Sequence, residues 1–182
     1  MKKIVITYGL ISGVIAAGFL WTSVLLWERG HLKFDNFDYG VLIGYASMLV
    51  SLAMVFFGVK AYRDNQAGRS IGFWKALQVG LLISLTCSAV YAVSWEAYMQ
   101  INPGFMERYV ASYLNRMKEK GTPQAEIDEA QQSMASIQEL YRNPALRFGF
   151  SLSEILPVGV IVSLLSAAVL RKRPERLVEQ PA

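Results

Sequence analysis

The sequence predicts an all-α membrane protein in which four helices cross the bilayer and a helical hairpin joins the third to the fourth. Two observations predict this class. Three runs of at least 20 residues carry no charge, a fourth is interrupted by a single acid, and Lys and Arg gather beside alternate ends of these runs. Because 20 helical residues rise about 30 Å, the thickness of bilayer hydrocarbon, each run can cross a membrane.

The four expected spans cover residues 4–27, 39–59, 74–97 and 148–170. A helix satisfies its own backbone hydrogen bonds, which lipid cannot do. The composition agrees, because 53% of the 182 residues are hydrophobic and only 18% are charged. The start of the chain resembles a signal peptide, but the length of the apolar run and the lack of a cleavage site favour an uncleaved first span. Residues 1–173 are expected to form one membrane domain.

The basic residues predict the orientation. If the spans alternate, ten of them lie on the side that holds the N-terminus: Lys2, Lys3, Lys60, Arg63, Arg69, Lys75, Arg171, Lys172, Arg173 and Arg176. Since Lys and Arg are retained on the cytoplasmic side, both termini are expected there, and residues 174–182 are expected to be a flexible cytoplasmic tail. The net charge of +4 therefore reflects membrane topology, and nucleic acid is not an expected partner.

The polar segment between the third and fourth spans has helical patterning. Apolar residues recur there with helical spacing, first at Phe105, Tyr109, Tyr113 and Met117, and then at Ile127, Ala130, Met134, Ile137 and Tyr141. Gly121 lies between the two stripes, where it suits the left-handed position after a helix. We expect an antiparallel hairpin over residues 103–143, outside the cytoplasm. Its stripes would face each other, the outer end of the bundle or the headgroup layer.

Small residues recur at four-residue spacing within the spans, at Gly9, Gly13 and Ala17, at Gly40 and Gly44, at Gly80, Ser84 and Ser88, and at Ser163 and Ala167. Such stripes let helices approach closely in lipid. We interpret them as packing within the bundle, with homo-oligomer formation as the alternative. A faint repeat also relates the first and third spans, because each ends in Trp-Glu, at residues 27–28 and 95–96. Duplication and chance both explain it.

A candidate polar site lies inside the fourth span. If the membrane began after Glu154, the remaining 16 residues would rise only about 24 Å, so Glu154 is expected within the bilayer. Pro157 frees the carbonyl of Ser153 at the same level, Glu96 approaches it from the third span, and Arg147 lies on the same face, within reach of Glu154. Three interpretations stay open: a carboxylate tied by Ser, Tyr, Trp or Arg donors, a proton or cation site of Glu154 and Glu96, and contact with a partner or lipid.

Motifs for catalysis are missing from the sequence. His31 is the only histidine and Cys87 the only cysteine, so one chain cannot build a zinc site of two histidines or of cysteines. Neither a Gly-x-Ser-x-Gly nucleophile motif, nor a Walker loop, nor a dinucleotide-binding glycine motif is present. We therefore expect neither an enzyme nor a bound cofactor or metal.

Five short stretches carry a resemblance: Phe-Phe-Gly-Val-Lys-Ala-Tyr-Arg-Asp at 56–64, Lys-Ala-Leu-Gln-Val-Gly-Leu at 75–81, residues 91–96, Tyr-Arg-Asn-Pro at 141–144, and Glu-Ile-Leu-Pro-Val-Gly at 154–159. In these the chain resembles the bacterial domain-of-unknown-function family numbered 4199, to about Arg173. The resemblance implies four helices in a bacterial inner membrane and supplies no activity. We expect a non-enzymatic interaction protein that presents the hairpin, with the lipid bilayer and a protein partner around it. The alternative is a small transporter or ion conductor using Glu154.

Overall fold

The computed structural model describes residues 1–30 and 37–171, without the side chains of residues 37–42 and 67, and this part of the chain is helical without strands. The helices are α1 (Lys2–Glu28), α2 (Phe37–Asp64), the short 3-10 helix η1 (Ala67–Arg69), α3 (Phe73–Ile101), α4 (Phe105–Glu119), α5 (Gln124–Arg142) and α6 (Pro144–Leu170). The expected tail at 174–182 and the loop histidine His31 lie outside the described residues.

Four helices are long and apolar enough to cross a membrane, which confirms the four predicted spans: α1, α2 from Ile43, α3 and α6. Each helix is longer than its apolar run because it continues into polar residues. The start of α6 shows why. The side chain of Asn143 accepts hydrogen bonds from the backbone N–H groups of Ala145 and Leu146, at 2.9 and 3.4 Å, so the helix begins four residues before position 148.

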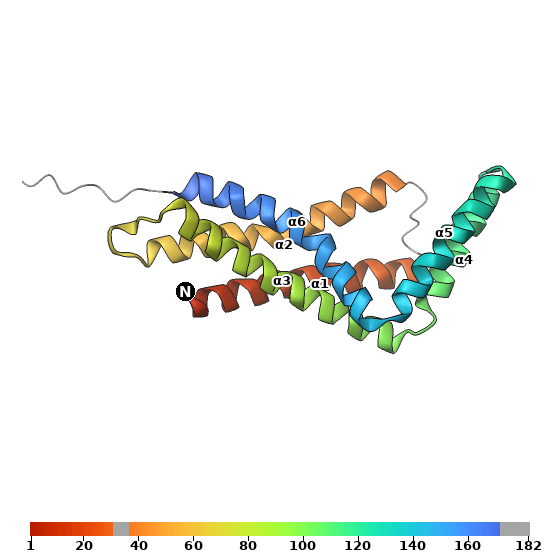
Figure 1. The fold of residues 1–182 in the computed structure, drawn as a ribbon, viewed down its shortest axis with the longest axis horizontal. Coiled ribbons are helices and arrows are strands. Elements are labelled where there is room, and N and C mark those ends of the chain that lie inside the picture. Colours follow the sequence, from red (N-terminus) through yellow and green to blue (C-terminus); the bar gives the residue numbers. More distant parts are fainter. Residues whose placement is uncertain (31–36, 172–182) are drawn as a thin grey trace, which may run out of the picture.

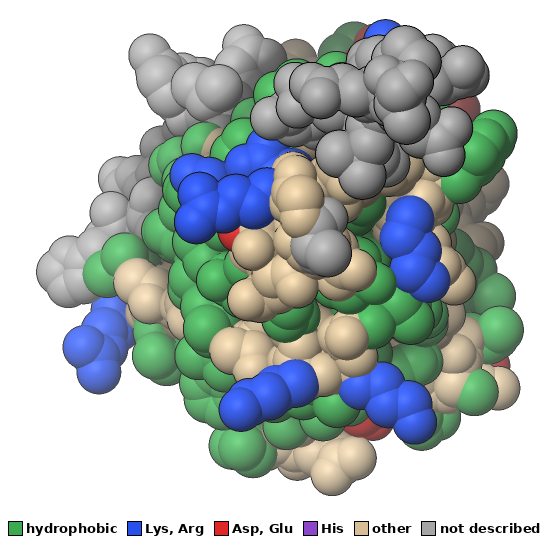
Figure 2. Space-filling view, turned by 90° about the vertical axis from the view of Figure 1, so that its left-hand side faces the viewer, with side chains coloured by type: hydrophobic (Ala, Val, Ile, Leu, Met, Phe, Trp, Pro, Cys, Tyr) green, Lys and Arg blue, Asp and Glu red, His purple; other side chains and the backbone are tan. Residues whose placement is uncertain are grey.

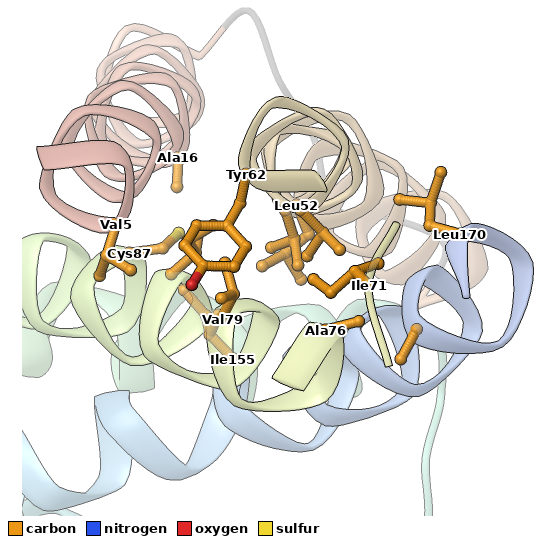
Figure 3. Packing of buried hydrophobic residues seen from close by; sticks show 14 residues of the cluster. Val5, Ala16, Leu52, Tyr62, Ile71, Ala76, Val79, Cys87, Ile155 and Leu170 are labelled. Carbon is orange, nitrogen blue, oxygen red and sulfur yellow. The ribbon is translucent and has the colours of Figure 1, made fainter. Parts of the chain in front are cut away.

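The four long helices form a bundle in which α3 packs against α1, α2 and α6, and α2 packs against α1 and α6 (Figure 1). α2 and α3 therefore separate α1 from α6. The centre of the bundle is filled by apolar side chains from all four long helices (Figure 3), including the fully buried Leu52, Val79, Cys87 and Ile155. Cys87 is thus part of the core.

Most small-residue stripes lie at contacts within the chain. A Cβ added to Gly9 or Gly13 of α1 would lie 2.5 Å from the Cβ of Thr86 or of Val90 on α3, and one added to Gly80 would lie 2.9 Å from the Cβ of Ser163 on α6. These glycines let the helix backbones approach closely. Gly44 differs, because no atom lies within 4 Å of the added Cβ, so nothing within the described chain requires a glycine there.

Buried serines add polar contacts to the same seams. The Ser12 hydroxyl donates to the carbonyl of Ser51 at 2.6 Å, which connects α1 to α2. The Ser84 hydroxyl donates to the carbonyl of Gly159 at 3.2 Å, which connects α3 to α6. Hydroxyl groups placed in an apolar bundle need such acceptors, and here the helix backbones supply them.

The two ends of the bundle differ in charge. The start of α1, the end of α2, η1, the start of α3 and the end of α6 meet at one end (Figure 1), where Lys and Arg side chains gather (Figure 2). We call it the basic end. The described basic residues of these elements are Lys2, Lys3, Lys60, Arg63, Arg69, Lys75 and Arg171; Lys172, Arg173 and Arg176 lie outside the described part.

The opposite end, which we call the hairpin end, carries α4 and α5 side by side at an angle to the bundle axis (Figure 1). Val110 of α4 and Ile127 of α5 are buried. The connecting turn depends on Gly121, whose φ of 71° lies in the left-handed region. It lets the N–H of Thr122 reach the carbonyl of Met117 at 3.0 Å and close the end of α4.

Candidate functional site

The hairpin is attached to the bundle by an ion pair on each side. Glu28 at the end of α1 accepts a hydrogen bond from Arg108 near the start of α4, at 2.7 Å. Glu96 near the end of α3 binds Arg147 in the first turns of α6, directly after the hairpin. We call these the two Glu–Arg pairs. Each glutamate follows the tryptophan of a Trp-Glu sequence, so both copies of the faint repeat in α1 and α3 take part in these pairs.

Arg147 forms the more buried of the two pairs, with 9% of its surface exposed. Its Nε donates to Oε2 of Glu96 at 2.7 Å and its Nη2 to Oε1 at 2.5 Å. Its Nη1 donates to the carbonyl of Tyr141 at 2.7 Å. A two-point pair of this kind is stronger and better oriented than a single hydrogen bond. One guanidinium therefore connects the ends of α3 and α5 to the start of α6.

An aromatic cluster supports the start of α4 beneath the other pair. Phe105 lies 5.5 Å from both Trp27 and Trp95 between ring centroids, and Tyr98 stacks on Trp95 at 5.6 Å. Trp21 joins the same cluster through Tyr98 and donates from Nε1 to the hydroxyl of Ser94 at 2.8 Å. Edge and stacked contacts of this kind fix ring orientation as well as position. The first turn of α4 is therefore anchored to both α1 and α3.

The structure separates the five residues expected to form one polar site. Arg147 was expected to reach toward Glu154, and this is wrong, because its guanidinium is bound to Glu96. Seven residues along α6 correspond to a rise of about 10 Å, whereas Glu96 lies beside Arg147. Among the described residues Glu154 is exposed and accepts no hydrogen bond from a Ser, Tyr, Trp or Arg side chain, so the binding of Glu154 by such donors stays a prediction.

The remaining members lie near Glu154 on α6. The Ser153 hydroxyl donates to the carbonyl of Phe150 in its own helix at 2.8 Å, and Ser153 is exposed. Pro157 lies inside α6 and is also exposed. Tyr91 and Tyr141 lie within electrostatic range of Glu154. The site thus divides into the Glu96–Arg147 pair and a polar face of α6.

Tyr141 lies beside both the Glu96–Arg147 pair and the polar face of α6. Its ring stacks on Phe150, with centroids 6.3 Å apart. Burial raises the pKa of its phenol, and the nearby Glu154 and Tyr109 raise it further, while Arg147 opposes them. Tyr141 is therefore a neutral hydroxyl at physiological pH, able to donate a hydrogen bond.

Sequence reasoning missed the Glu28–Arg108 pair and the carbonyl of Tyr141 as an acceptor. The signal for the pair was present, since a second Trp-Glu ends α1 as one ends α3, and Arg108 follows the end of α3 by one short turn. No His, Cys, Asp or Glu side chains gather in threes that could hold a metal ion within residues 1–30 and 43–171.

These features define a class: a helical membrane protein with four spans and a helical hairpin attached across one end. Within that class, the chain belongs to the family described as "Protein of unknown function (DUF4199)", which matches residues 7–172. The match includes most of the first span, the other three spans and the hairpin. Comparisons with curated proteins and with solved structures gave no match.

Proposed function

We propose that this is a non-enzymatic protein of the bacterial inner membrane that presents the α4–α5 hairpin, outside the cytoplasm, to a protein partner. The observation that carries the proposal is a contrast. The hairpin is fixed to the bundle on both sides, yet part of its apolar surface faces nothing in the described chain.

The fixed attachment favours presentation of a defined surface. A polar hairpin that served only as a linker between α3 and α6 would need no specific contacts with the bundle. Here Arg108 and Arg147 bind the ends of α1 and α3 at the hairpin's two bases, and Phe105 packs between tryptophans from both helices. Such preorganisation reduces the ordering cost when a partner binds.

The exposed apolar surface favours a protein contact. Ile137 and Leu140 on α5 are 37% and 40% exposed, and Leu146 and Phe150 on the adjoining part of α6 are 45% and 46% exposed. Together they extend from α5 onto α6. An apolar stripe on an amphipathic helix whose opposite side carries charged residues such as Glu139 and Arg142 is typical of helix-in-groove recognition.

The charge distribution supports the orientation. The basic end lies opposite the hairpin end, and basic segments are retained in the cytoplasm. The hairpin would then face the periplasm, where a soluble or membrane-bound partner can reach it.

Photo-crosslinking in living cells tests this proposal. A photoreactive amino acid at Leu140 should form a discrete protein adduct, whereas the same group at Gln131, exposed on the opposite side of α5, should not. If Leu140 captures lipid alone, or if both positions give the same adducts, the hairpin does not present a specific protein-binding surface.

The alternative function is transport of protons or cations through Glu154. The observation that favours it is a carboxylate in an apolar helix with no donor among the described residues. Purified protein in liposomes should then carry ion flux, and Glu154→Gln should abolish it because the amide cannot titrate. Equal flux in both proteins would exclude this role.

A further inference from the structure

One face of α6 places polar groups on the outside of the bundle, within an apolar span. Ser153, Glu154 and Pro157 are exposed, and so are Ile161 and Leu164, at 57% and 41%. At about 100° per residue these side chains occupy an arc of about 100° on the side away from the buried Ile155 and Gly159. We call this the Glu154 face. It is separate from the hairpin and from the partner-presenting function proposed for it, but it includes the carboxylate on which the alternative transport function depends.

Lipid is a poor neighbour for this face. Glu154 lies 16 residues before the end of α6, or about 24 Å, and about 10 Å from Arg147 toward the basic end. That depth falls inside the hydrocarbon. An ionised carboxylate facing lipid there is costly, and even a neutral acid costs free energy when its O–H lacks an acceptor. The part of the chain that the structure describes supplies no partner for Glu154, and a contact with another molecule would supply one.

The Glu154 face is complementary to itself. Pro157 has no N–H, so the carbonyl of Ser153 loses its helical donor and remains an acceptor. A neutral Glu154 carries one O–H donor. We propose that this face joins two copies of the chain about a two-fold axis, with Glu154 of each copy donating a hydrogen bond to the Ser153 carbonyl of the other.

A second copy fits this face better than a cationic helix from another protein. Two copies inserted in the same direction place Ser153 and Glu154 at the same depth, and a two-fold axis exchanges donor and acceptor. Neither copy then carries a charge in the contact. A foreign cation would bring a second charge into the hydrocarbon, and desolvation can exceed the attraction within a buried ion pair.

Disulfide trapping in membranes tests the contact. In full-length protein carrying Cys87→Ser, oxidation of Ile161→Cys should give a covalent dimer. Val14→Cys, exposed at 64% on α1, is the matched control and should remain monomeric. A monomer at position 161, an adduct of another mass, or equal crosslinking at both positions overturns the proposal.

Substitution of Glu154 tests the hydrogen bond. Glu154→Gln keeps an N–H donor, so its dimer affinity in lipid vesicles, measured by energy transfer between labelled copies on dilution, should stay within about twofold of the wild type. Glu154→Ala should weaken the dimer about tenfold, as expected for two lost interhelical hydrogen bonds. Equal affinity of the Gln and Ala variants overturns the proposal. Loss of ion flux in a Gln variant that still dimerises would separate transport from dimer formation.

Discussion

Arg147 is the residue on which the attachment of the hairpin depends most. Its guanidinium donates three hydrogen bonds, two to Glu96 and one to the carbonyl of Tyr141, and the side chain is buried. The side chain of Asn143 fixes the start of α6 and hence the direction in which Arg147 points. Capping, helix register and ion pairing therefore act together within a short stretch of chain.

Arg147→Met should destabilise the protein by about 2–3 kcal/mol, because Glu96 would keep its charge without an opposite charge beside it, and only the Gln100 side chain would still donate to it, at 3.4 Å. The loss can be measured as a shift in unfolding when SDS is titrated into mild detergent. The double variant Glu96→Gln with Arg147→Met should recover part of it, since the unpaired charge is removed.

The matched control is Arg142→Met. Arg142 pairs with Glu139 at 3.1 Å, but both side chains are more than 70% exposed, so the change should cost less than about 0.5 kcal/mol. If Arg142→Met and Arg147→Met destabilise the protein equally, the Glu96–Arg147 pair contributes no more to stability than the exposed Glu139–Arg142 pair.

The sequence predicted part of this arrangement. Glu96 was expected to approach the level of Glu154 from the third span, and Arg147 to lie on the same face as Glu154. The pairing of Glu96 with Arg147 was not predicted, since it depends on how far α6 extends toward the hairpin and on which way this helix is rotated about its own axis. Hydropathy reports neither property: the apolar run begins at position 148, whereas the helix begins at Pro144.

At the scale of the helices, glycine contacts determine how closely α1 approaches α3. Gly9 and Gly13 lie one turn apart on the same face of α1, and they face the Cβ atoms of Thr86 and Val90 on α3. The four-residue spacing predicted a packing face here. It could not distinguish this face from that of Gly44, which meets nothing, because sequence spacing carries no information about the neighbouring helix.

Gly13→Ala should destabilise the bundle. The new Cβ would lie 2.5 Å from the Cβ of Val90, so the helices must separate, at a cost of about 1–3 kcal/mol. Gly18→Ala in the same helix is the control, because its Cβ meets no atom within 4 Å and alanine favours helix. Unfolding in SDS should occur earlier for Gly13→Ala and unchanged or later for Gly18→Ala. The reverse order would contradict the α1–α3 contact.

At the scale of the whole molecule, the number of spans and the position of the hairpin have different physical causes. The number of spans follows from the apolar runs that are long enough to cross the bilayer as helices. This number was predictable because it depends only on the length and composition of each run. The position of the hairpin relative to the bundle was not predictable. It depends on contacts of Arg108 with Glu28 and of Phe105 with Trp27, which join segments about 80 residues apart in the chain.

The last prediction concerns the orientation of the whole molecule, which follows from the separation of the basic end from the hairpin end. A cysteine that replaces Gln131 in α5 or Gln66 between α2 and η1 would be exposed at the surface, and neither substitution alters the charge of the protein. Cys87, the only native cysteine, is buried in the core and should stay unlabelled. With the basic end in the cytoplasm, a membrane-impermeant maleimide should label Gln131→Cys in intact spheroplasts. Gln66→Cys should react only after the membrane is permeabilised. Labelling of Gln66→Cys but not of Gln131→Cys in intact spheroplasts would contradict this orientation and would mean that the hairpin lies in the cytoplasm.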